Sequence, residues 1–78
     1  NAIAPGWVNT SMAREGLVAM AEHGQREYDD VLQEQMSHVL LGKMSEPEEI
    51  SELIAYLLLQ TSITGQTLDI NNGAVMPA

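Results

Sequence analysis

The sequence predicts an α/β fold in which two short strands flank two or three helices. Residues 1–4 form a short apolar run, residues 66–70 alternate polar and apolar side chains as a strand does, and helical periodicity fills the segment between them. A connection of that length suits a parallel crossover, which is right-handed in nearly all proteins. The 78 residues leave room for one small domain.

The first strand is expected over residues 1–4, because the Pro5-Gly6 turn signal closes the run. Ser11 is then the expected N-cap of a short helix that reaches about Glu22. Apolar side chains on one face of this helix are Met12, Leu17, Val18 and Ala21.

A second helix is predicted over residues 28–40. Its apolar positions follow the i, i+3, i+4, i+7 spacing, with Gln35 as the one polar interruption. Gly42 stands where a glycine often ends a helix. Together with the first helix this region covers residues 11–41.

The third helix, over residues 46–60, has the strongest local signals. Ser45 and Glu48 have the spacing of a capping box, and Pro47 falls in the first turn. The stripe expected to be buried is Ile50, Leu53, Ile54, Leu57 and Leu58. After the strand at 66–70, Asn71-Asn72-Gly73 predicts a turn, and a short tail follows.

The composition excludes several classes of function. Three basic residues against eleven acidic ones give a net charge of −8, which argues against nucleic acid and anionic membranes as partners. The longest strongly apolar stretch, residues 54–59, is far too short to span a bilayer. No cysteine is present, which fits a reducing compartment, and a cytoplasmic location is expected. His23 and His38 have no spaced ligand set, so no metal site is predicted.

Three blocks resemble the short-chain dehydrogenase/reductase family. NAIAPGWVNT at 1–10 resembles its sixth strand and Pro-Gly motif, LGKMSEPEEI at 41–50 the entry to its last long helix, and ITGQTLDINNG at 63–73 its seventh strand. The blocks occur in the family's order and spacing over essentially the whole chain. Among the departures, Lys43 stands where Arg is common, Ser45 where Gly is common, and Asn71-Asn72 where Asp-Gly or Asn-Gly is usual.

The resemblance implies the C-terminal part of a doubly wound, Rossmann-type parallel sheet and a cofactor, NAD or NADP, in the intact enzyme. It assigns nicotinamide-side contacts to Pro5, Gly6, Val8 and Thr10; the alternative is an ordinary turn followed by a helix-entry residue. It also makes residues 11–40 a substrate lid, with side chains that line an apolar pocket or simply fill core. The predicted lid positions are Trp7, Met12, Leu17 and Met20.

The family's chemistry also needs residues that these 78 do not contain. No Gly-rich pyrophosphate loop is present. The Tyr-x-x-x-Lys pair is absent too, because Leu32 follows Tyr28 at that spacing and Gln60 follows Tyr56. No residue is therefore assigned as catalytic, and the chain alone is not expected to bind a nicotinamide cofactor tightly.

Three hypotheses follow for what the chain does. In the first it is a segment of a larger nicotinamide-dependent oxidoreductase. In the second it is a non-catalytic remnant that associates with itself, and in the third a small helical interaction protein. The first two leave one apolar strand edge and one sheet face uncovered, so the expected partners are the remainder of the same enzyme or identical chains in a homo-oligomer.

Overall fold

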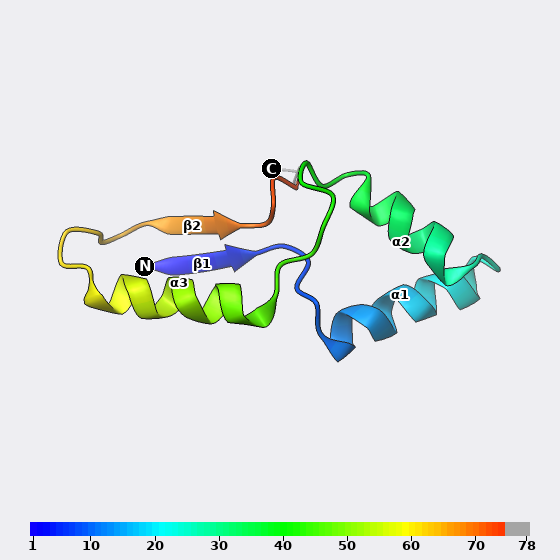
Figure 1. The fold of residues 1–78 in the computed structure, drawn as a ribbon, viewed down its shortest axis with the longest axis horizontal. Coiled ribbons are helices and arrows are strands. Elements are labelled where there is room, and N and C mark those ends of the chain that lie inside the picture. Colours follow the sequence, from blue (N-terminus) through cyan, green and yellow to red (C-terminus); the bar gives the residue numbers. More distant parts are fainter. Residues whose placement is uncertain (75–78) are drawn as a thin grey trace.

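A computed structural model describes residues 1–74 and contains five elements in the order β1, α1, α2, α3, β2 (Figure 1). Their bounds are Ala2–Pro5, Ser11–His23, Tyr28–Met36, Pro47–Leu59 and Thr67–Ile70, in that order. The predicted α/β class is confirmed. The last residues of the predicted tail, 75–78, lie outside the described part of the chain.

The two strands form a parallel sheet in which Ala2 pairs with Thr67 and Pro5 with Ile70. Helix α3 runs back along the strands in the opposite direction, so β1, α3 and β2 form the crossover that the sequence predicts (Figure 1). We call these three elements the body. In β2 the exposed and half-buried side chains alternate, with Leu68 and Ile70 turned inward.

Helices α1 and α2 form an arm that projects from one end of the body (Figure 1). The radius of gyration is 14.8 Å, whereas a compact domain of this length has about 11.5 Å. The buried cluster lies within the arm and consists of Leu17, Ala21 and Val31. The side chains packed against it are those of Trp7, Tyr28, Leu32 and Met44.

The caps of two helices differ from the sequence predictions. Thr10, and not Ser11, is the N-cap of α1, because its hydroxyl accepts the Ala13 amide at 3.3 Å while Ser11 is already helical. Helix α3 is capped by Glu46 instead of Ser45, and the Glu49 carboxylate accepts the Glu46 amide at 2.9 Å. The predicted cap at Ser45 is wrong, because the Ser45 backbone pairs with the loop after β1 in an isolated parallel bridge to Val8.

The second helix ends earlier than predicted, at Met36 instead of near Leu40. Beyond it, Val39 forms an antiparallel bridge with Ala74, and the Leu41 amide donates to the Asn72 carbonyl at 2.9 Å. Backbone pairing with the turn after β2 therefore replaces the last helical turn. Val39 is still buried, as its periodicity suggests, whereas Leu40 is 83% exposed.

The predicted stripe on α3 is only half-buried. No residue of α3 is fully buried; Ile50, Leu53 and Leu57 are intermediate, while Leu58 is 80% exposed. The prediction of a buried stripe is wrong for Ile54 and Leu58, because nothing within residues 1–74 packs over that flank. None of the helices in this range is both long and apolar enough for a bilayer crossing.

Candidate functional site

The main hollow lies where the arm meets the carboxyl ends of the strands. It has a volume of about 690 Å³, within the usual range for small-molecule sites. Ligands of open parallel sheets bind at this edge. The cavity is lined by Pro5, Gly6, Trp7, Val8, Thr10, Met12, Ala13, Gly16, Gln35, His38, Val39 and Ala74.

The structure brings together the four positions that the sequence assigns to cofactor contact, with Trp7 and Met12 of the predicted lid. Two other predicted lid residues lie elsewhere. Leu17 is fully buried in the arm, and Met20 is 45% exposed and does not line the cavity. The contacts of all these positions with a cofactor or substrate remain a prediction.

The structure explains why position 6 is a glycine without any reference to a ligand. Its amide donates to the Ile70 carbonyl at 3.2 Å, so the sheet pairing continues past the end of β1. A Cβ atom at this position would lie 2.7 Å from the Asn71 Cβ, which is closer than real contacts allow. The glycine therefore lets β1 and the turn after β2 approach each other at the edge of the cavity.

Thr10 combines two roles at the entrance of α1. Its hydroxyl accepts the Ala13 amide at 3.3 Å and donates to the Val8 carbonyl at 3.4 Å, while the residue also lines the cavity. The helix-entry interpretation of this residue is therefore correct. A cofactor group that accepts a hydrogen bond would need the Thr10 hydroxyl proton to turn away from the Val8 carbonyl, whereas a donor such as a carboxamide N–H could use the second lone pair of the hydroxyl oxygen.

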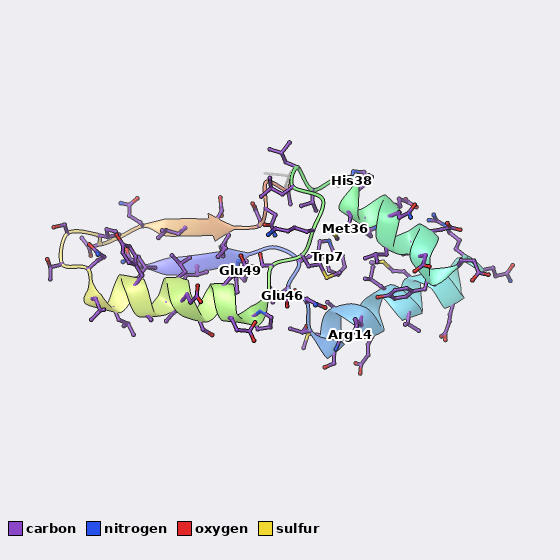
Figure 2. All side chains as sticks on the ribbon, in the orientation of Figure 1. Trp7, Arg14, Met36, His38, Glu46 and Glu49 are labelled. Atoms are coloured by element: carbon purple, nitrogen blue, oxygen red, sulfur yellow. The ribbon has the colours of Figure 1, made fainter. Side chains whose placement is uncertain are left out.

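Trp7 lies at the junction of the body and the arm (Figure 2). It packs against the buried cluster of the arm and also lines the cavity. The sequence leaves a core role and a substrate role open for this side chain. The packing shows the core role, and the substrate role stays a prediction. A ligand in the cavity would contact the ring that anchors the arm to the body.

Sequence reasoning missed part of the cavity wall, namely the side chains that α2 and the residues after it contribute. Gln35 and His38 supply polar groups to a wall that is otherwise mainly apolar. One signal was available for Gln35, since it interrupts an apolar stripe. His38 carries no such signal, because it follows the end of α2.

Three stretches of chain are joined by hydrogen bonds beside the cavity. The Ser45 amide donates to the Trp7 carbonyl at 2.9 Å, and the Asn9 amide donates to the Ser45 carbonyl at 2.8 Å. The Asn72 carboxamide donates to the Ser45 hydroxyl at 3.0 Å. Through these bonds the loop after β1, the segment between α2 and α3, and the turn after β2 hold one another.

A second polar link crosses the other side of the same junction. The side-chain nitrogen of Asn9 donates to the Glu46 carboxylate at 3.2 Å. The side-chain oxygen of Asn9 accepts a hydrogen bond from the Arg14 guanidinium at 3.0 Å. Figure 2 shows Arg14 on the arm and Glu46 at the start of α3. The link therefore ties the first turn of α1 to the first turn of α3.

The cavity offers no metal centre and no evident proton-transfer pair. Within residues 1–74 no group of three or more His, Cys, Asp or Glu side chains is arranged for a metal ion. Tyr28 and Lys43 both line a separate hollow of about 390 Å³, and no hydrogen bond between their side chains is present in this part of the chain. The main cavity can hold a ring against its apolar wall and offer a few hydrogen bonds to polar groups attached to that ring.

The class of protein follows from the fold and the position of the cavity: a parallel α/β unit with a ligand-sized hollow at the carboxyl edge of its strands. A family model described as enoyl-(acyl carrier protein) reductase matches residues 1–75. A crystal structure of a short chain dehydrogenase family protein from Francisella tularensis superposes with a TM-score of 0.81 at 27% identity, covering 91% of this chain and 30% of that one. The chain belongs to the short-chain dehydrogenase/reductase family.

Two curated relatives show how the chain is related to whole enzymes. It is 36% identical to the (S)-acetoin-forming diacetyl reductase of Staphylococcus aureus, over 94% of this chain and 29% of that protein. It is 39% identical to a chloroplastic tropinone reductase homologue of Arabidopsis thaliana, over 94% of this chain and 20% of that protein. The chain thus spans less than a third of the length of these relatives.

Proposed function

We propose that this chain is the C-terminal segment of an NAD- or NADP-dependent oxidoreductase and forms the nicotinamide side of its active site. The observation that carries the proposal is the cavity itself. Pro5, Gly6, Val8 and Thr10 line it together, at the carboxyl edge of the parallel strands. In this proposal the cofactor, when bound, supplies or accepts the hydride.

The residues of the cavity suit a nicotinamide ring. Apolar walls from Pro5, Val8 and Val39 would pack on the ring and keep water from it. The Thr10 hydroxyl and the backbone at the start of α1 would hold a carboxamide or a phosphate oxygen. The arm, with Met12 at the cavity and Trp7 at its base, would act as the lid over the substrate.

The chemistry would be completed by other parts of the enzyme. Residues 1–74 place no tyrosine on the wall of the main cavity, so the proton donor and the pyrophosphate loop would come from elsewhere. The likeness to a diacetyl reductase supports a small carbonyl compound as substrate. The proposal includes a cytoplasmic location, for which the lack of cysteine in the chain is the support.

The exposed flank of α3 supports a further part of the proposal, a contact with the remainder of the enzyme or with an identical chain. Ile54, Leu58 and Leu59 are 45%, 80% and 82% exposed. An apolar surface on a helix that packs on one side of a sheet is typical of a buried interface. The same surface favours the alternative function, a non-catalytic chain that associates with itself.

Substitutions at Thr10 test the cofactor contact. In the complete polypeptide that carries this chain, Thr10→Asp keeps an N-cap acceptor but removes the hydroxyl donor and adds a negative charge. We expect the Kd for NADH or NADPH, measured by fluorescence titration, to rise about tenfold or more. Thr10→Ser keeps both functions and should bind like the native protein. Unchanged cofactor binding by Thr10→Asp would show that Thr10 is only a cap.

A second measurement separates the two candidate functions. The complete polypeptide should oxidise NADH or NADPH with diacetyl as the probe substrate. The 78-residue chain alone should show neither this turnover nor saturable quenching of Trp7 by micromolar cofactor. Self-association without turnover, in the complete polypeptide as well, would favour the non-catalytic alternative.

A further inference from the structure

The segment that returns from the arm to the body, residues 37–46, runs between two other parts of the chain. On one side the Ser45 backbone pairs with residues 7–9, which line or adjoin the cavity. On the other side Val39 and Leu41 pair with residues 72–74. We call residues 37–46 the return segment. Its position sets where the arm leaves the body and where Val39 and His38 meet the cavity.

Asn72, in the turn after β2, makes several of the contacts that hold the return segment in place. Its carboxamide nitrogen donates to the Lys43 carbonyl at 3.2 Å and to the Ser45 hydroxyl at 3.0 Å. Its backbone carbonyl accepts the Leu41 amide at 2.9 Å. One residue of the turn after β2 is thus bonded to three positions of the return segment.

The backbone of Asn72 has a conformation that most residues other than glycine avoid. Its φ is +54°, in the left-handed region that glycine adopts without strain and other residues adopt less readily. A glycine would suit the backbone better but would have no carboxamide. Asn is among the side chains that tolerate this region, so the residue keeps the turn and adds two donated hydrogen bonds.

Ser45 is the complementary half of the contact. It is 1% exposed, and its side chain lies against Asn72 while its backbone bonds to Trp7 and Asn9. Ser45 and Asn72 are two of the positions at which this sequence departs from the glycines common in the resembling segments. The structure places these two departures in hydrogen-bond contact.

We infer that Asn72 and Ser45 form a latch that fixes the return segment against the cavity wall and thereby positions the arm. Asn72 is a positioning residue that acts through Ser45 on Trp7 and Asn9. The latch is a property of the chain's own contacts. Only its effect on substrate binding rests on the proposed oxidoreductase function.

Hydrogen exchange and a double-mutant cycle test the latch in the complete polypeptide. Asn72→Gly removes the carboxamide while easing the backbone, and Ser45→Ala removes the hydroxyl. Each is expected to speed exchange of the Ser45 and Asn9 amides about fivefold, the factor that corresponds to one ordinary hydrogen bond. The double variant should show little more than Asn72→Gly alone, because the bond that Ser45→Ala removes is one of the two that the Asn72 carboxamide donates. Gln66→Ala, which removes a carboxamide at the far end of β2, is the matched control and should leave these amides unchanged.

Steady-state kinetics then asks whether the latch serves the site. With diacetyl as probe and saturating NADPH or NADH, Asn72→Gly should raise KM about fivefold and leave kcat within about twofold, because the arm is mispositioned while the reacting groups are intact. Unchanged exchange at Ser45 and Asn9, or strictly additive effects in the double variant, would overturn the latch whatever the enzyme does. Faster exchange with no turnover by the native protein would keep the latch and refute the oxidoreductase proposal instead.

Discussion

The arm and the body differ in where they bury apolar side chains. Within residues 1–74 every buried hydrophobic residue lies in the arm or in the return segment: Leu17, Ala21, Val31 and Val39. The body, which carries the family's sheet, has none. The large apolar side chains of its strands, Ile3, Leu68 and Ile70, are only half-buried. Several large apolar side chains of α3 are exposed to solvent.

This difference separates two sources of order in the chain. The arm closes its own small core, since α1 and α2 pack on each other around Leu17. The body is ordered by backbone pairing, and a parallel sheet of two strands is normally covered on both faces. We therefore expect the body to depend on surfaces that other polypeptide would supply, and the arm to depend mainly on itself. Each prediction below tests one side of this contrast in the complete polypeptide.

The largest effect is expected in the core of the arm. Leu17→Ala leaves a cavity at a fully buried position and should lower the local stability of α1 by about 3 kcal/mol. Hydrogen exchange of the α1 amides measures it. Val18→Ala, next in sequence but 43% exposed, is the control and should cost less than about 1 kcal/mol. Equal losses in the two variants would mean that the arm has no core of its own.

The next effect concerns the uncovered flank of the body. Leu58→Glu places a charge on the flank of α3 that we expect another surface to cover. It should weaken the association of the body with that surface about tenfold, as measured by sedimentation. Met12→Glu is matched in exposure, at 81% against 80%, but lies on the arm. It should sediment like the native protein. The expected dependence of the body on cover fails if Leu58→Glu also leaves sedimentation unchanged.

A smaller effect is expected at the entrance to the arm. Thr10→Ala removes the N-cap of α1 and should lower the stability of its first turn by about 1 kcal/mol, as seen in the exchange of the Ala13 amide. Ser11→Ala should change this exchange little, because Ser11 is already helical. The reverse order would restore the assignment of the cap to Ser11.

The smallest effect is expected at the start of α3. Glu49→Ala removes the carboxylate that accepts the Glu46 amide and should cost about 0.5 kcal/mol. Glu48→Ala, in the same turn of the helix, retains that bond and is the control. Exchange of the Glu46 amide distinguishes the two variants, and a similar rate in both would argue against the cap.

Local signals predicted the elements of the body well. Pro47 lacks the amide that a first turn leaves unpaired, so the start of α3 is visible in the sequence. The alternation of polar and apolar residues at 67–70 predicts β2. The long stretch of sequence between the two strands favours the parallel crossover. Half of the residues that line the candidate cavity are predicted site positions, because the family resemblance marks the segment that follows the first strand. They are Pro5, Gly6, Trp7, Val8, Thr10 and Met12.

The sequence by itself determined the order of strands and helices, the crossover and the acidic charge, because propensity, periodicity and composition act on neighbouring residues. Only the tertiary structure decided which side chains cap the helices, where α2 ends and what completes the cavity. Those outcomes depend on partners far away in sequence: Asn9 meets Glu46 across 37 positions, and Ser45 meets Asn72 across 27. A serine that reads as a cap becomes half of a buried contact once the backbone around it is paired.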